Sequence, residues 1–208
     1  RRIISCNRRL EELFGYEPGE LLGELSERFY ASQEDFDRIG VEAYATIGED
    51  RNYSVELPLR RKDGTLFAGA LTGRAIDPAH PQEGSIWVYA DITEQKLAQQ
   101  ESQRLRQAVD QSPVMIFMTN TSGVIEYVNP TFTRVTGFSE GDAVGKTPRI
   151  LKSGENPPEF YADLWNTLLA GKVWNGTLRN RCKDGRLIWV DATMSAIVDS
   201  NGRATHFM

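Results

Sequence analysis

The sequence predicts an α+β protein made of two domains with the same layout. A length of 208 residues suits two domains of about 100 residues each. Motifs of the first half recur in the second at a nearly constant spacing, and in each half helical stretches precede strands joined by an Asp-Gly turn. Helices followed by antiparallel strands indicate a sheet with its helices on one face.

The repeat rests on two blocks of residues. In the first block an asparagine and two glycines are found again 122 residues later (129 − 7): Asn7, Gly15 and Gly23 match Asn129, Gly137 and Gly145. In the second block Lys-Asp-Gly at 62–64 recurs at 183–185, now 121 residues later (183 − 62). One residue has therefore been gained or lost between the blocks, and the halves share one layout.

Each half contains a short helical stretch that begins at an asparagine and ends before a glycine, at 7–14 and 129–135. Asparagine caps helix starts, and glycine adopts the left-handed conformation at helix ends. A second amphipathic stretch follows, and then two strands joined by Lys-Asp-Gly, a strong signal for a tight hairpin. The strands after the turn, 65–76 and 187–198, are long enough to be central, and 199–202 is a further turn.

Only the second half has an opening strand. We expect it at Val114 to Asn120, with a turn at 121–123 and a partner strand at 124–128. The corresponding first strand of the first half would precede Arg1, and the last strand of the second half runs to Met208. The predicted domains are therefore 1–93, without its opening strand, and 112–208, without the end of its last strand.

A helical linker at 94–111 is predicted between the domains. The stretch from Thr93 to Val109 is polar, lacks glycine and proline, and ends just before Ser112 and Pro113. A sparse apolar stripe along it fits either a weak coiled-coil seam or a helix that lies on its own domain: Ala98, Leu105, Ala108 and Val109.

Composition excludes several classes of protein. The net charge of −5 comes from 24 basic and 29 acidic residues without long runs of one sign, so nucleic acid is not expected as a partner. Two cysteines, Cys6 and Cys182, cannot build a disulfide scaffold or a zinc site, and they suit a reducing cytoplasm. No apolar stretch approaches the roughly 20 residues of a membrane span. We find no nucleophile with a base, no metal cluster and no phosphate loop, so we expect no enzyme and no catalytic residue.

Several motifs in this order resemble PAS domains of bacterial sensors. They are Asn-x-x-Phe at Asn129, the runs 136–138, 144–146, 174–176 and 180–185, and Asp-Ile-Thr at 91–93. The resemblance covers nearly the whole chain. It implies, for each domain, a five-stranded antiparallel sheet with helices on one face enclosing a pocket, and signals that leave through flanking helices. It also implies a cytoplasmic homodimer with an effector in the same polypeptide, such as a histidine kinase or diguanylate cyclase.

The second half is similar to PAS domains that hold FAD in redox sensors, over 146–154 and on through Trp165, Trp174 and Asn180. The resemblance implies FAD in the second domain, and we take as its binding residues Asn180, Trp165, Leu151, Phe117 and Met194. Blue-light relatives place a reactive cysteine where this chain has Pro148, so no cysteine photoadduct is expected there. Haem-binding relatives need a histidine on the helix before the hairpin. His80 and His206 lie elsewhere, so we expect both to be solvated or simply packed.

One residue gives the flavin hypothesis a physical basis. Leu178 and Asn180 share a strand face, so if Leu178 points inward, a carboxamide does too. An unpaired buried amide costs about 1 to 3 kcal/mol. A flavin ring edge offers both donors and acceptors to such an amide, but a backbone group or a trapped water would serve as well.

The first half is an internal control, because Leu59 stands where the second half has Asn180. With Leu57 beside it, that pocket is apolar, and we expect no flavin there. Trp165 and Trp174 correspond to Tyr44 and Tyr53, which favours packing roles for these aromatics. The leading hypothesis is a redox or oxygen sensor using FAD in the second domain. The alternatives are a ligand-free pair for interaction and dimerisation, or a sensor of a small metabolite.

Overall fold

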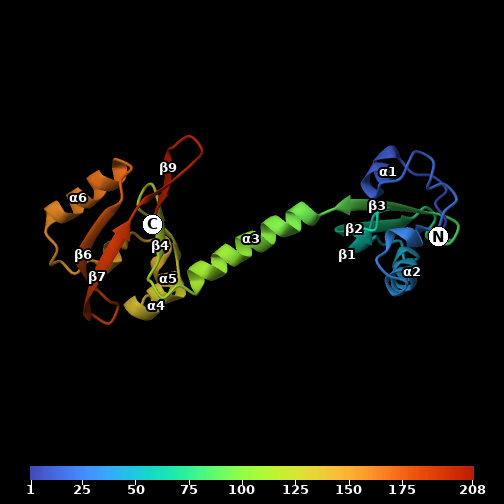
Figure 1. Cartoon of the computed structure of the whole chain (residues 1–208). Coiled ribbons are helices and arrows are strands. Elements are labelled where there is room, and N and C mark those ends of the chain that lie inside the picture. The colour runs from blue at the N-terminus through green and yellow to red at the C-terminus, as the bar shows by residue number, and fades with distance from the viewer. The chain divides into compact units, whose positions relative to one another are not determined.

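A computed structural model describes all 208 residues (Figure 1). The chain divides into two compact units, Arg1–Ser102 and Gln103–Met208. Each unit combines helices with antiparallel strands, which confirms the predicted α+β class. No helix is both long enough and apolar enough to cross a lipid bilayer.

The first unit places its helices before its strands. Its three strands form one antiparallel sheet in the order β1-β2-β3. The elements are α1 (Arg8–Phe14), the 3-10 helix η1 (Ser26–Phe29), α2 (Gln33–Ile47), β1 (Tyr53–Arg60), β2 (Leu66–Ala75) and β3 (Ser85–Asp91).

The second unit has six strands in two sheets, β5-β4-β9-β8 and β6-β7. The elements are β4 (Phe117–Asn120), β5 (Ile125–Val128), α4 (Pro130–Thr136), α5 (Glu140–Ala143), η2 (Pro148–Leu151), α6 (Pro158–Leu169), β6 (Trp174–Arg181), β7 (Leu187–Met194), β8 (Ala196–Val198) and β9 (Ala204–Phe207).

Two strands of the second unit differ from the sequence prediction. The strand predicted at 187–198 is interrupted at Ser195, whose N–H and C=O both pair with Met208 at 2.9 Å. Counted as one interrupted strand, β7 and β8 give five strands in the order β5-β4-β9-β8/β7-β6. The opening strand begins at Phe117 rather than Val114, because the side chain of Asn129 bonds to the carbonyl of Val114 and the N–H of Ile116.

Caps and turns form where the sequence predicts them. Asn7 and Asn129 cap α1 and α4 by accepting a backbone N–H three residues on, and both helices end at a left-handed glycine, Gly15 or Gly137. Glycines with a φ of 88° occupy the Asp-Gly turns of the hairpins β1–β2 and β6–β7. These are conformations that side chains other than glycine avoid.

The same backbone contacts support both units. A glycine N–H bonds to an isoleucine carbonyl near the start of each unit, a lysine N–H of each hairpin bonds back to the end of the first helix, and one isolated bridge joins the 3-10 segment to the hairpin. These contacts are Gly23–Ile3 and Gly145–Ile125, Lys62–Phe14 and Lys183–Thr136, and Tyr30–Leu59 and Lys152–Asn180. The last pair places Leu59 and Asn180 at equivalent positions.

Helix α3 (Thr93–Asp110) runs almost over the predicted range and contains no buried residue. The first unit holds its start, because the N–H of Ala68 donates to the Thr93 hydroxyl at 3.1 Å and Lys96 pairs with Glu56 at 2.7 Å.

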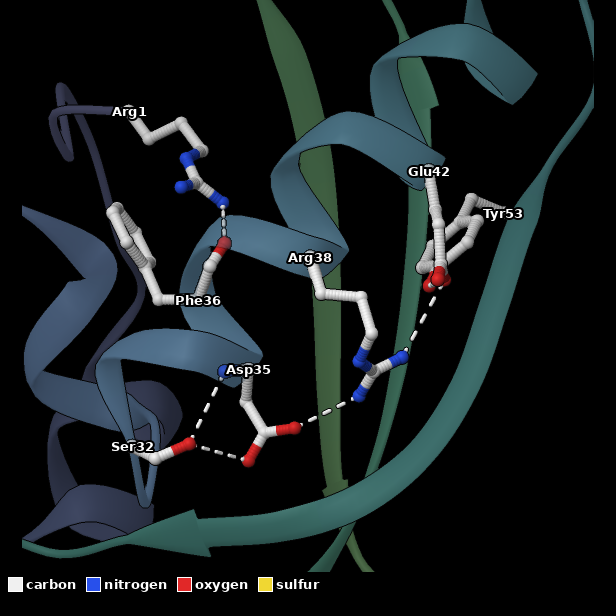
Figure 2. A network of polar contacts seen from close by, with 7 residues as sticks. All are labelled: Arg1, Ser32, Asp35, Phe36, Arg38, Glu42 and Tyr53. Carbon is white, nitrogen blue, oxygen red and sulfur yellow. Dashed lines mark hydrogen bonds and ion pairs between the residues drawn. The ribbon is translucent and has the colours of Figure 1, made fainter.

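Polar contacts tie α2 to the sheet of the first unit (Figure 2). Ser32 caps the helix, Arg38 pairs with Asp35 at 2.8 Å and with Glu42 at 3.5 Å, and the Tyr53 hydroxyl on β1 donates to Glu42 at 2.9 Å. The second unit repeats the last contact, since the Trp174 indole on β6 donates to Asp163 on α6 at 3.0 Å.

Candidate functional site

A cavity of about 1160 Å³ lies inside the second unit, between the inner face of the strands and the segments η2 and α6. Its size exceeds the roughly 300 to 1,000 Å³ of ordinary small-molecule sites. The five binding residues proposed from the sequence all line it: Phe117 on β4, Leu151 on η2, Trp165 on α6, Asn180 on β6 and Met194 on β7. The fold therefore brings these five residues into one wall.

Asn180 is the unusual group in this wall. It points inward together with Leu178, as the strand period predicts, and each residue is only 6% exposed. Its carboxamide forms none of the side-chain hydrogen bonds of the structure. Its polar atoms are not fully enclosed, because the single fully enclosed side-chain nitrogen or oxygen without a partner is Arg179 Nε. The amide of Asn180 therefore faces the open space of the cavity. A backbone partner, one of the alternatives considered above, is not what the structure shows.

Thr119 is a second polar residue of the wall, which the sequence reasoning missed. It is 3% exposed, it lines the cavity from β4, and its hydroxyl forms no hydrogen bond with the protein. The period of two could have identified it, because Thr119 follows Phe117 by two residues on one strand.

The two tryptophans of the predicted site differ in their surroundings. Trp165 is 37% exposed, lines the cavity, and meets Phe207 edge to face with ring centroids 5.6 Å apart. Trp174 is buried, packs edge to face on Phe160, and does not line the cavity. Trp174 thus packs the domain, whereas Trp165 is available to an occupant of the cavity.

Two cations, Arg149 and Lys152, also line the cavity and are exposed to solvent. Neither forms an ion pair, and the Lys152 ammonium lies 5.2 Å from the centre of the Tyr161 ring. Asp191 is the one acidic side chain of the lining, so the lining side chains keep a net positive charge, which favours an occupant with an anionic part.

The strand that carries Asn180, β6, is fixed to the loop between η2 and α6. The Ser153 hydroxyl donates to the carbonyl of Arg179 at 2.6 Å. The side chain of Asn156 donates to the same carbonyl at 2.9 Å and accepts the N–H of Arg179 at 3.1 Å. These bonds hold the backbone around Asn180, so its amide is presented at a defined place.

The interior of the first unit is filled with side chains at the equivalent positions. Leu59 is fully buried against Gly69, where an added Cβ would lie 2.2 Å from its Cδ1 atom. Phe14 and Phe29 stack at a centroid distance of 3.9 Å, and Tyr89 meets both edge to face. Burial raises the pKa of Tyr89 well above its usual value. The inward amide of the second unit has no counterpart here.

Histidines and cysteines do not assemble a site. His80 is exposed beside Asp77 at 3.0 Å, and His206 lies 3.2 Å from Glu126. Burial raises the pKa of Cys6, while the sulfur of Cys182 lies 3.5 Å from the carbonyl of Val135. No group of three or more His, Cys, Asp or Glu residues is arranged to hold a metal ion.

Comparison with known families gives two matches in one chain. Residues 103–208 match the family described as PAS fold, and residues 1–94 match the family described as PAS domain.

Three curated relatives resemble part of the chain. A nitrogen fixation regulatory protein of Klebsiella pneumoniae is 36% identical over 100 residues, 48% of this chain and 20% of the relative. Sensor protein TdiS of Thauera aromatica is 36% identical over 117 residues, 56% of this chain and 21% of the relative. The aerotaxis receptor of Escherichia coli is 30% identical over 90 residues, 43% of this chain and 18% of the relative. The chain spans about a fifth of the length of these relatives.

Proposed function

Because this chain belongs to the PAS family and consists of two PAS domains of a signalling protein, we propose that its second domain senses redox state or oxygen by binding FAD. PAS domains are sensory, regulatory modules. In this proposal the signal leaves through flanking helices to an effector elsewhere in the same polypeptide.

The observation that carries the proposal is the Asn180 carboxamide, buried to 6% exposure, without a protein partner, and open to the cavity. An occupant with hydrogen-bonding atoms on a flat edge would satisfy its donor and acceptor together. Because its polar atoms are open to the cavity, such an occupant would replace the water that bonds to them. A relative named as an aerotaxis receptor supports a stimulus related to oxygen.

The residues present fit a flavin. Asn180 would bind the polar edge of the ring, Leu151, Phe117 and Met194 would pack on its apolar faces, and Trp165 would contact the part nearest the solvent. Arg149 and Lys152 are the cations that this wall offers to an anionic portion. A bound flavin supplies reversible electron transfer with a change of protonation, and Asn180 is placed to respond to that change through its hydrogen bonds.

The visible absorption spectrum tests the proposal. We expect the purified 208-residue protein to be yellow or to become so when FAD is added, and to stay yellow after gel filtration. A colourless protein that takes up no FAD would sink the flavin proposal. With flavin bound, Asn180→Leu should shift the absorption bands or the reduction potential, while the control Leu59→Ile in the first domain should change neither. Unchanged values in Asn180→Leu would mean that Asn180 is not the contact.

The first domain has a different proposed role, as a ligand-free module for interaction and homodimer formation. Its interior is occupied by the stacked Phe14 and Phe29 and by Leu59, which supports this role. Light scattering of the protein should give twice the mass of one chain, 23.4 kDa. A monomer at high concentration would contradict the homodimer.

A further inference from the structure

Asn129, at the start of α4, makes more contacts than a helix cap needs. It is 0% exposed, and its Oδ1 atom accepts the N–H of Phe132 at 3.0 Å and that of Ile116 at 2.9 Å. Its Nδ2 atom donates to the carbonyls of Val109 at 3.2 Å and Val114 at 2.9 Å. One carboxamide thus connects three segments, which are the last turn of α3, the stretch before β4, and α4.

The bond to the N–H three residues on is the helix cap. Asn7 makes the same bond before α1, where its side chain accepts the N–H of Leu10 at 3.0 Å. The bond to Phe132 is the equivalent of that cap. The bonds to Val109, Val114 and Ile116 are additional, and they reach toward the preceding helix.

Two of the additional contacts, those to Val114 and Ile116, end on the cavity wall. Val114, Met115, Ile116 and Phe117 line the cavity in one continuous stretch, and Asn129 holds two backbone groups of that stretch. The same carboxamide holds the carbonyl of Val109 in the last turn of α3. A shift of this wall therefore changes the hydrogen bonds of the Asn129 carboxamide, and the last turn of α3 is bonded to the same carboxamide.

Two neighbouring side chains hold the last residue of α3 and the chain just after it. The Thr131 hydroxyl donates to the carbonyl of Ser112 at 2.7 Å, and the Tyr127 hydroxyl donates to Asp110. Burial and the Asp110 carboxylate raise the pKa of Tyr127 to about 12, so this donor keeps its proton at neutral pH. The last turn of α3 is thus attached to the second domain through side chains, although none of its residues is buried.

We propose that Asn129 is a positioning residue that couples the state of the cavity to the last turn of α3. When the cavity wall between Val114 and Phe117 moves, the bonds to Val114 and Ile116 rearrange, and the bond to Val109 rearranges with them because the amide is one rigid plane. This coupling gives the second domain a route to the helix whose start is tied to the first domain. Its meaning in signalling rests on the proposed sensory function, while the coupling is a property of these residues.

The test uses Asn129→Asp in the 208-residue protein. An aspartate still caps α4, because its oxygen accepts the N–H of Phe132. It loses both donors and sets an oxygen against the carbonyls of Val109 and Val114. Amide hydrogen exchange at residues 107–112 should become at least tenfold faster. Asn7→Asp, which keeps the only side-chain bond of Asn7, is the matched control and should leave exchange at 107–112 unchanged.

Coupling to the cavity is read with a second substitution, Phe117→Ala, which loosens the wall without any ligand. It should change exchange at 107–112 by severalfold when Asn129 is present and leave it unchanged in the Asn129→Asp background. Equal effects in both backgrounds would overturn the proposal, as would normal exchange in Asn129→Asp. If Asn129→Asp does not fold, Asn129→Ser, which keeps a cap oxygen and lacks the amide donor, takes its place.

The outcome separates this inference from the flavin proposal. If the protein takes up no FAD but shows the Asn129-dependent effect of Phe117→Ala, the coupling proposal holds and the flavin proposal fails. A protein that binds FAD and shows no such dependence retains the flavin and loses the coupling.

Discussion

In the first PAS domain Phe14 and Phe29 stack at 3.9 Å, whereas the second domain has Thr136 and Leu151 at the equivalent positions and a cavity of about 1160 Å³. Leu71 is likewise replaced by Ala192, and Leu59 by Asn180. Not every one of these residues is smaller in the second domain, because Gly69 corresponds to the larger Val190. Trp87 and Tyr89, on the strand β3 that pairs with β2, also pack against the core of the first domain.

Outside the two interiors, in contrast, individual contacts of the first domain recur at equivalent residues of the second. Lys62 pairs with Glu20 at 2.6 Å, and Lys183 pairs with Asp142 at 2.5 Å, joining the hairpin to the same region in each copy. Caps, turn glycines and a few backbone bonds are therefore common to both domains, whereas several inward side chains differ between them. That division can be tested by exchanging residues between the domains.

Leu59→Asn should have the largest effect. It places an amide in a fully buried site packed against Gly69, with no cavity to face. We expect the first domain to lose about 3 kcal/mol of its free energy of unfolding, from the lost packing and the unpaired amide. Urea unfolding followed by methyl NMR of Leu71 in the first domain and Leu168 in the second measures each domain separately.

The reciprocal change, Asn180→Leu, is the control for this comparison. It removes an amide that has no protein partner, so the free energy of unfolding of the second domain should change by less than about 1 kcal/mol. Equal losses from Leu59→Asn and Asn180→Leu would mean that the two interiors are equivalent, against the comparison drawn above.

Phe29→Leu should have the next largest effect, because it gives the first domain the residue that the second has at Leu151. It removes one ring of the stacked pair, so we expect a loss of about 2 kcal/mol and an internal space that binds xenon. Xenon-induced shifts of the Leu71 methyl resonances detect that space. Leu151→Phe should act in the opposite direction and reduce the FAD uptake proposed for the second domain. Unchanged uptake would show that Leu151 does not border the ligand.

Much of this architecture could be predicted from the sequence, because local signals determine it. Asn7 and Asn129 as caps, the Asp-Gly hairpins, the long polar helix and the inward direction of Leu178 with Asn180 all follow from short-range rules, and the structure has each of them.

The remaining features depend on contacts between distant segments. β4 begins late because the Asn129 side chain takes the backbone groups of Val114 and Ile116, and the break at Ser195 reflects its pairing with Met208. That Arg149 and Lys152 line the cavity is likewise evident only when η2 and α6 are placed in space. Such contacts leave no periodic pattern in the sequence.

A smaller difference is expected at alkaline pH. In the first domain burial raises the pKa of Tyr30 and of Tyr53 to about 12, and it also raises the pKa of Tyr89. In the second domain Tyr127 is the tyrosine whose pKa is raised. An unfolded tyrosine titrates near pH 10, so the stability that these protons contribute is complete below about pH 10 and is lost as pH rises toward 12.

The first domain should therefore lose stability more steeply than the second between pH 10 and 12. Urea midpoints from the Leu71 and Leu168 methyl signals at a series of pH values measure the two slopes. Tyr53→Phe should make the slope of the first domain shallower, and an unchanged slope would count against Tyr53 as a contributor.

The smallest effects should come from the paired salt bridges, which are exposed and screened by salt. Lys183 and Ser139 hold the pKa of Asp142 below its usual value, and Lys62 with the N–H of Glu17 does the same for Glu20. Because both pKa values are lowered, the stability they contribute is present above the unfolded pKa of about 4 and is lost as pH falls.

Asp142 also accepts the N–H and hydroxyl of Ser139, at 2.9 and 2.7 Å, whereas Glu20 accepts one backbone N–H at 3.0 Å. Carboxyl carbon NMR should therefore show that the pKa of Asp142 stays below its usual value in Lys183→Met. In Lys62→Met the pKa of Glu20 should return closer to its ordinary value. An equal return of both pKa values would mean that the contacts with Ser139 do not lower the pKa of Asp142 beyond the effect of the lysine.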